Sequence, residues 1–168
     1  MQVRWILIGL VALSSAGCRS EASPAPLTAV EALSATDSAR AFVDEVAKGV
    51  TRDGPAAWRR YFAASPDFFM AAEGRLVFAN HDAALQGIAA LTKVITRIDL
   101  RWGSPLQVYA LTNEVVVVAA PYHESRVDVE GHAIEEDGYF TGLAVRDAGG
   151  WRFRNAHWSV APASSQVP

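Results

Sequence analysis

The side chains best suited to chemistry are an imidazole, carboxylates and phenols that stand far apart in the chain. His157, paired with the carboxylate of Asp137 or Asp67, could move a proton on the carbon next to a carbonyl group. Tyr61 or Tyr139 could then stabilise the enolate. This set predicts a cofactor-free isomerase, dehydratase or cyclase. Each residue also has a structural interpretation: His157 as a hydrogen-bonded core histidine, Asp137 in the solvated acidic run 135–137, and Asp67 in a turn or cap.

The last strand-like segment predicts which side chains share an interior. Arg152 and Arg154 are hard to bury, so we expect the alternate residues of 151–159 to point inward. The preceding segment and the aromatic residues near Trp58 are expected to complete the wall, as in sites for small apolar or amphipathic molecules. The predicted lining is Trp58, Tyr61, Phe62, Phe69, Tyr139, Thr141, Trp151, Phe153, Asn155, His157 and Ser159.

Composition and motifs argue against other chemistries. The formal net charge is −3, from 15 Lys and Arg against 18 Asp and Glu, whereas nucleic-acid binders cluster basic residues. The histidines at 81, 123, 132 and 157 show no paired metal-ligand spacing, and a single cysteine excludes a thiolate-cluster zinc site. The chain has no glycine-rich phosphate loop and no nucleophile elbow. We therefore predict no metal and no cofactor.

Three helical segments are expected before the sheet. The cap residues of 36–38 begin a first helix, which runs at helical spacing to Asp53 and Gly54. Pro55 begins a short second helix. A third follows Asn80 or Asp82, either of which could cap it.

Alternation and turn residues predict the strands. A hairpin is expected over 68–78, and long strands over 96–110, 115–128, 132–146 and 151–160, with a bend at 103–105. Short connections favour an antiparallel meander. The sequence thus predicts an α+β fold with three N-terminal helices packed in a strongly curved antiparallel sheet. Pro121 invites a bulge, so alternation does not decide whether His123 or Glu124 faces inward.

The first residues carry a targeting pattern. Arg4 precedes the apolar run 5–13, which is too short to span a bilayer, and the small residues 14–17 follow it. This order is the layout of a secretory signal. The single cysteine, Cys18, follows directly, and the segment resembles a bacterial lipoprotein signal. The resemblance implies a signal peptide over 1–17, an acylated Cys18 with a flexible tether over 18–35, and attachment to the periplasmic side of a bacterial membrane. Arg19 favours the outer membrane, and Ser15 keeps ordinary secretory cleavage open.

The segments Phe140–Arg146 and Gly150–Ser159 resemble the last two strands of SnoaL-like domains. These belong to the nuclear transport factor 2-like superfamily of cystatin-like α+β cones, and Trp58–Phe62 fits the same pattern. The resemblance covers residues 36–161 and implies one domain there, followed by a flexible tail over 162–168. It speaks to fold more than to function, because the family holds both enzymes and binding proteins.

Two functions follow as alternatives. The first is a membrane-anchored binding module that holds a small apolar or amphipathic molecule, or a partner, in an aromatic-lined cone. The second is the acid–base enzyme that uses His157 with a pocket carboxylate. A homodimer through the outer sheet face is a further expectation, with Trp158, Trp102 and Val116 or Val118 buried between chains.

Overall fold

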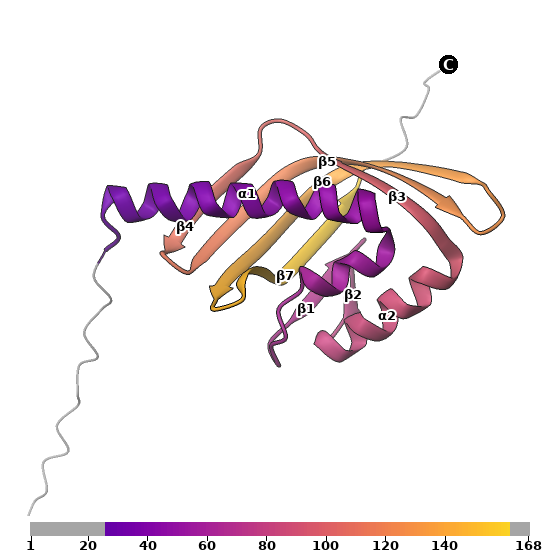
Figure 1. Cartoon of the computed structure of the whole chain (residues 1–168), viewed down its shortest axis with the longest axis horizontal. Coiled ribbons are helices and arrows are strands. Elements are labelled where there is room, and N and C mark those ends of the chain that lie inside the picture. Colours follow the sequence, from indigo (N-terminus) through magenta and orange to yellow (C-terminus); the bar gives the residue numbers. More distant parts are fainter. Residues whose placement is uncertain (1–25, 162–168) are drawn as a thin grey trace, which may run out of the picture.

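A long helix lies along the inner face of a curved sheet, and two shorter helices lie toward one end of it (Figure 1). The computed structural model describes residues 26–161. The lipoprotein-like signal, Cys18 and the tail over 162–168 lie outside these residues. The fold is α+β, as predicted.

The long helix α1 (Ala29–Asp53) begins earlier than predicted. The Thr28 hydroxyl accepts a hydrogen bond from the Glu31 backbone N–H, and the Glu31 carboxylate accepts one from the Thr28 backbone N–H. This capping box satisfies two N–H groups that a helix start leaves free. The predicted start at 36–38 was therefore wrong, and residues 29–35 are helical rather than part of a tether.

The remaining helices and the hairpin lie where they were predicted. The segment after Gly54 is a 3-10 helix, η1 (Pro55–Arg60), and α2 (His81–Val94) is capped by the Asn80 side chain, which accepts from the Ala83 N–H at 2.9 Å. Strands β1 (Phe69–Ala72) and β2 (Arg75–Phe78) form the hairpin. Its two turn residues, Glu73 and Gly74, have φ of 50° and 71°, the left-handed conformation that a tight hairpin needs.

The sheet departs from a simple meander at its edges. β5 (Val115–Asp128), β6 (Ala133–Asp147) and β7 (Gly150–Val160) pair antiparallel in chain order, as predicted. The predicted strand 96–110 is two strands, β3 (Ile95–Trp102) and β4 (Gln107–Thr112), and both pair with β5 rather than with each other. β1 adds to the other edge, parallel to β7. The order is therefore β2-β1-β7-β6-β5-β3, with β4 beside β5.

The core lies between α1 and the inner face of the sheet. Val43, Val46 and Val50 on α1 are fully buried, as are Phe140 and Phe153 on the strands opposite. Two indoles tie the layers together: the Trp102 N–H donates to the Val43 carbonyl at 2.8 Å, and the Trp151 N–H to the Ser38 hydroxyl at 3.1 Å. These bonds satisfy polar groups that would otherwise be costly to bury.

A bulge in β7 sets the orientation of the last strand. Leu143 pairs with Asn155 but the next residue, Ala144, pairs with Phe153, so Arg154 is an extra residue in β7. An extra residue reverses the alternation of the side chains that follow it. Phe153 faces the core, and after the bulge Ala156 and Trp158 do so as well.

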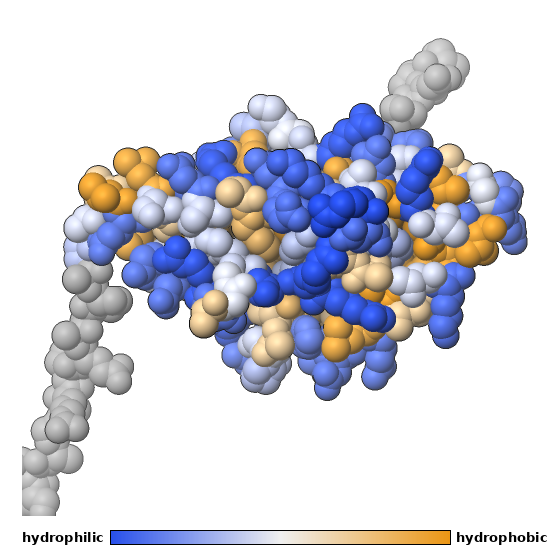
Figure 2. All heavy atoms as spheres, viewed as in Figure 1, coloured by the Kyte–Doolittle hydropathy of each residue, from blue (hydrophilic) through white to orange (hydrophobic). Residues whose placement is uncertain are grey.

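The face that carries α1 is mostly hydrophilic, with apolar side chains near the start of the helix and a second apolar group at the opposite end of the molecule (Figure 2). Val30 and Leu33 there are 77% and 64% exposed. No helix among residues 26–161 is both long enough and apolar enough to cross a membrane.

Candidate functional site

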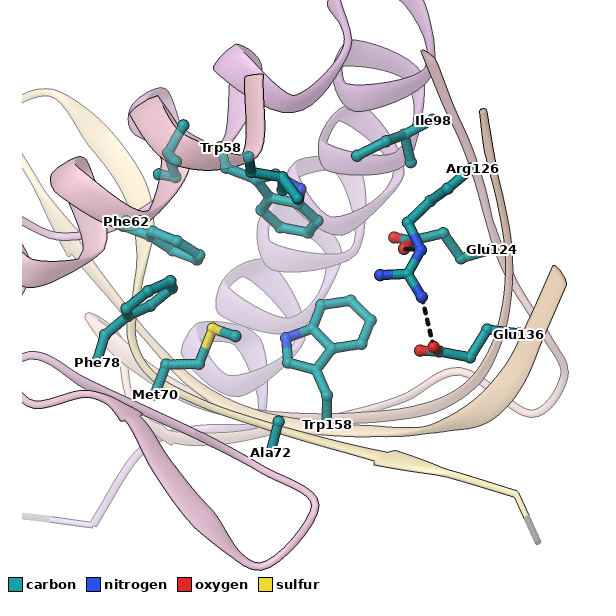
Figure 3. Close-up of a pocket in the computed structure, with 13 residues that line it drawn as sticks. Trp58, Phe62, Met70, Ala72, Phe78, Ile98, Glu124, Arg126, Glu136 and Trp158 are labelled. Atoms are coloured by element: carbon teal, nitrogen blue, oxygen red, sulfur yellow. Dashed lines mark hydrogen bonds and ion pairs between the residues drawn. The ribbon is translucent and has the colours of Figure 1, made fainter. Parts of the chain in front are cut away.

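A cavity of about 300 Å³ lies between the inner face of the sheet and the helices η1 and α2 (Figure 3). Elements from most of the chain contribute to its wall, so the site depends on the complete fold. Most lining side chains are apolar, and three are charged. The lining residues are Trp58, Phe62, Met70, Ala72, Phe78, Gly87, Ile88, Leu91, Ile98, Glu124, Arg126, Glu136 and Trp158.

Aromatic rings form much of the apolar wall. Trp58 of η1 stacks on Phe62 of the loop that follows, with 5.5 Å between ring centroids and an interplanar angle of 20°. Trp158 of β7 meets Trp58 edge to face at 5.7 Å. Gly87 of α2 makes room for the Phe78 ring, because a Cβ at this position would overlap that ring. The wall therefore offers both faces and edges of aromatic rings to a bound molecule.

The charged side chains come from two neighbouring strands. Glu124 and Arg126 stand two residues apart on β5, and Glu136 of β6 is the direct partner of Glu124 in the sheet register. Side chains two residues apart, or directly opposite, share one face of a sheet, so all three reach the cavity. In Figure 3 the guanidinium of Arg126 lies between the two carboxylates.

Arg126 is committed mainly to Glu136. Its Nη2 donates a short hydrogen bond to Glu136 Oε2, and Glu136 Oε1 accepts a second bond, from the Tyr122 hydroxyl at 2.8 Å. Arg126 Nε lies 3.2 Å from Glu124 Oε1, a charge contact that lacks hydrogen-bond alignment. Glu136 is therefore well satisfied, whereas the Glu124 carboxyl accepts no hydrogen bond from residues 26–161.

Burial gives Glu124 an unusual protonation equilibrium. Its side chain is only 12% exposed. The pKa of Glu124 is raised to about 7: loss of hydration raises it most, the charge of Arg126 opposes the rise, and the charge of Glu136 adds to it. Burial, together with the bond to Glu136, also raises the pKa of the Tyr122 hydroxyl. Near neutral pH the cavity thus holds a carboxyl group that can donate or accept a proton.

The predicted lining residues separate into three groups. Trp58 and Phe62 lie in the cavity wall. Tyr61, Trp151 and Phe153 are buried in the core but do not line the cavity. The others lie on the outer face of the sheet, where Phe69, Thr141, Asn155 and His157 line a shallow depression and the Ser159 hydroxyl bonds to the Tyr139 carbonyl.

The predicted catalytic residues do not meet in the cavity. His157 is exposed on the outer face, because the β7 bulge turns it there and turns Trp158 inward. Asp137 pairs with His123 at 2.9 Å, and Asp67 with Arg154 at 2.9 Å. The Tyr61 hydroxyl donates to the Glu45 carbonyl at 3.2 Å. The interior orientation predicted for His157 was therefore wrong.

The outer-face residues predicted for a dimer face inward instead. Trp102 and Trp158 stack at 5.8 Å inside the fold, and Val116 and Val118 are fully buried. These residues cannot form an outer interface. The homodimer itself stays a prediction.

The sequence analysis missed the charged side chains of the cavity. The question left open at Pro121 resolves with Glu124 inward and His123 outward, because β5 alternates regularly from Val116 to Arg126. Residues 115–120 are all apolar, so the sequence alone gives no inner or outer position from which to count to Glu124 and Arg126.

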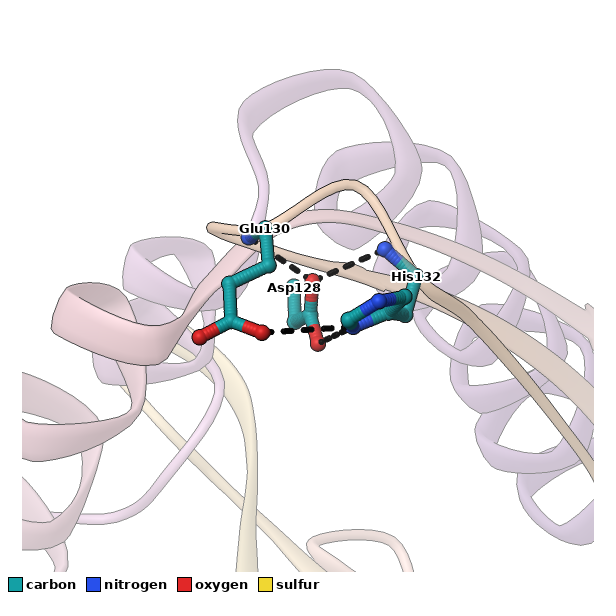
Figure 4. A group of neighbouring side chains, drawn as sticks. All are labelled: Asp128, Glu130 and His132. Carbon is teal, nitrogen blue, oxygen red and sulfur yellow. Dashed lines mark hydrogen bonds and ion pairs between the residues drawn. The ribbon is translucent and has the colours of Figure 1, made fainter.

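A second polar group lies on the hairpin between β5 and β6 (Figure 4). Within residues 26–161 it is the one group of side chains with the ligand types and spacing of a metal site: Asp128, Glu130 and His132. Asp128 Oδ1 accepts the backbone N–H groups of Glu130 and His132, each at 2.8 Å, and Oδ2 contacts His132 Nδ1 at 3.0 Å. These bonds, led by the backbone bond from His132, lower the pKa of Asp128. Hydrogen bonds within this group therefore stabilise the turn between β5 and β6.

Comparisons with solved structures define the fold as nuclear transport factor 2-like, also called cystatin-like. A nuclear transport factor 2-like superfamily protein from Salmonella enterica serovar Typhimurium aligns with a TM-score of 0.66 and 14% identity, over 80% of this chain and 96% of that one. An uncharacterized cystatin-like protein from Caulobacter vibrioides gives 0.58 and 17%, over 76% and 90%. A hexachlorocyclohexane dehydrochlorinase of type 2 gives 0.62 and 14%, over 82% and 95%. No protein-family model matches the sequence, and no curated protein is similar to it.

Proposed function

We propose that the protein binds a small amphipathic molecule in the cavity, with the apolar part among the aromatic rings and the polar part at Glu124. One observation carries this proposal: a nearly buried carboxyl without a hydrogen-bond donor faces an aromatic-walled cavity. A donor group on a ligand in the cavity can supply the hydrogen bond that the described residues do not give this carboxyl. The volume of about 300 Å³ suits a molecule of one or two rings.

The test compares two neighbouring alanines of β1. Ala72 lines the cavity and stands beside Trp158, whereas Ala71 stands beside His157 on the outer face. With indole as the probe, ligand-detected NMR is expected to show binding to the wild type and to Ala71→Phe, but not to Ala72→Phe, which fills the cavity. Equal binding by all three proteins would place the probe elsewhere and reject the proposal.

We also propose that the protein is exported and held by acyl chains on Cys18, which would keep the cavity at the periplasmic side of a membrane. Support comes from the sequence of residues 1–18 alone. Processing of the full chain is expected to be blocked by globomycin, and labelled palmitate to be incorporated into the wild type but not into Cys18→Ser. Globomycin-insensitive cleavage would indicate an ordinary secreted protein.

Acid–base catalysis is the second candidate function, and the protonation of Glu124 favours it. A carboxyl with a pKa of about 7 can take a proton from the carbon next to a carbonyl group and return it to the same molecule. Arg126 N–H could stabilise the enolate oxygen. The test is deuterium exchange into the methyl group of acetophenone in deuterated water: exchange that Glu124→Gln abolishes supports catalysis, and no exchange above the buffer rate leaves binding alone.

A further inference from the structure

The charged side chains of the cavity do not balance. Two carboxylates, Glu124 and Glu136, share the space with one guanidinium, that of Arg126. Arg126 and Glu136 form the tighter pair, and the Tyr122 hydroxyl completes the bonds to Glu136. When Glu124 is ionised, the cavity therefore carries one uncompensated negative charge.

No other charged residue of the wall offsets this charge. Arg126 stands on the same strand as Glu124, and Glu136 and the Tyr122 hydroxyl complete the polar groups on this side. The side chains from η1, α2, β1, β2, β3 and β7 that line the cavity are apolar: Trp58, Met70, Ala72, Phe78, Ile88, Leu91, Ile98 and Trp158. A second positive charge near Glu124, in addition to that of Arg126, must therefore come from a proton or from a ligand.

We infer that the ligand is a small organic cation, an amine or quaternary ammonium compound, whose positive group lies against Glu124 and whose apolar body lies among the aromatic rings. This inference rests on the proposed binding function and names its ligand class. Aromatic faces attract a cation, and the attraction is strongest where water is excluded. An anionic ligand would meet two carboxylates with only one guanidinium to offset them, and a neutral ligand would leave the excess negative charge of the cavity uncompensated.

The cation competes with the proton for Glu124. Because the pKa of Glu124 is about 7, binding of a cation below this pH releases a proton, and the affinity rises with pH until Glu124 is ionised. A neutral ligand causes no such release. Calorimetry at a pH of about 6, below the pKa of Glu124, in two buffers that differ in ionisation enthalpy measures the number of protons released.

The experiment uses three molecules of similar size that differ in charge: benzylammonium is positive, benzyl alcohol neutral and benzoate negative. Each is titrated into the wild-type protein at a pH of about 8, above the pKa of Glu124. We expect benzylammonium to bind about tenfold or more tightly than benzyl alcohol, a difference of the size that one buried charge contact provides. Benzoate should bind most weakly.

Two variants test whether Glu124 causes the preference for benzylammonium. Glu124→Gln should remove the preference for benzylammonium and the proton release, because the glutamine side chain carries no charge and takes up no proton. Glu135→Gln is the matched control, since Glu135 stands next to Glu136 but contacts His123 and Ser125 on the outer face. It should keep the wild-type preference.

The outcomes separate this inference from the proposed function. Equal binding of benzyl alcohol and benzylammonium, or tighter binding of benzoate, overturns the inference that the ligand is a cation. The cavity would then remain a binding site for another class of molecule. A preference that survives Glu124→Gln places the cation elsewhere and also overturns the inference. Binding of none of the three molecules, with no indole binding either, rejects the proposed function as well.

Discussion

Glu124 and Glu136 are direct partners in the register of β5 and β6, so two carboxylates stand side by side on the inner face of the sheet. Only Arg126 stands between them. Like charges directly opposite each other destabilise a sheet unless a cation or a proton compensates them. The properties of the cavity therefore depend on the protonation of Glu124.

The stability of the protein should fall as Glu124 ionises. The pKa of Glu124 is about 7 in the folded state against an ordinary value of 4.5, so the folded protein holds the proton more tightly than the unfolded chain. The contribution of Glu124 to the free energy of unfolding is then highest below a pH of about 4.5 and declines by about 3 kcal/mol as the pH rises through 7. Denaturation by urea at a series of pH values measures this slope. Glu124→Gln should remove it, and a wild-type curve that does not differ from the variant curve between these values would contradict the raised pKa.

Removal of Arg126 should be costly because it leaves two carboxylates without their cation. We expect Arg126→Met to lower the free energy of unfolding by about 3 kcal/mol or more at alkaline pH, and by less in acid, where Glu124 is protonated. Arg101→Met is the control, since Arg101 contacts Asp99 at 2.9 Å on the surface with 71% of its side chain exposed. Its cost should be much smaller than that of Arg126→Met, because solvent screens an exposed ion pair. Equal losses in the two variants would mean that Arg126 is not a buried charge.

His157 and Trp158 are neighbours whose substitutions should differ sharply. Trp158 contacts the rings of Trp58, Trp102 and Tyr122, so Trp158→Ala should cost about 3 kcal/mol and weaken indole binding. His157 is exposed on the other face, so His157→Ala should change stability by no more than about 0.5 kcal/mol and leave binding unchanged. Thermal denaturation and the NMR binding assay measure both effects. A large loss of stability in His157→Ala would contradict the exposed position of this side chain on the outer face.

Gly138 should be intolerant of a side chain. A Cβ at this position would overlap the backbone carbonyl oxygen of Ser159 and the ring of Tyr122. Gly138→Ala must therefore shift β7 or the tyrosine, at a cost of about 1 to 3 kcal/mol. Gly149→Ala is the control, because its Cβ would meet only side-chain atoms of Asp147 and Arg152 in a surface turn. Chemical denaturation of both variants measures the two losses of stability. A Gly138→Ala variant as stable as the wild type would mean that the strands can separate there.

Much of the fold could be predicted from local patterns, because helix and strand periodicities are local. The α+β class and the strands β5, β6 and β7 were predicted to within a few residues. The start of α1 was missed although its signal was local: Thr28 and Glu31 have the spacing of a capping box, and the cap residues of 36–38 diverted the interpretation.

The candidate site was harder to predict because it depends on register. Alternation along β7 puts His157 inside only if no residue is inserted, and nothing in the sequence near Arg154 indicates the insertion. Glu124 and Arg126 could not be placed by counting along β5, because residues 115–120 are apolar at every position, and a charged side chain is ordinarily assigned to the surface. Their burial follows from the pairing of β5 with β6, which brings Glu136 to Arg126.

The pairing register at Arg154, as well as the composition of β7, decides what the interior contains. If β7 kept all its residues but lost the bulge, every later side chain would turn to the opposite face, and the imidazole of His157 and the hydroxyl of Ser159 would replace the indole of Trp158 in the interior. Deletion of Arg154 itself would leave a regular strand in which Trp158 still faces inward. When distant relatives are aligned column by column through this strand, residues that occupy equivalent space fall one position apart unless the bulge is counted.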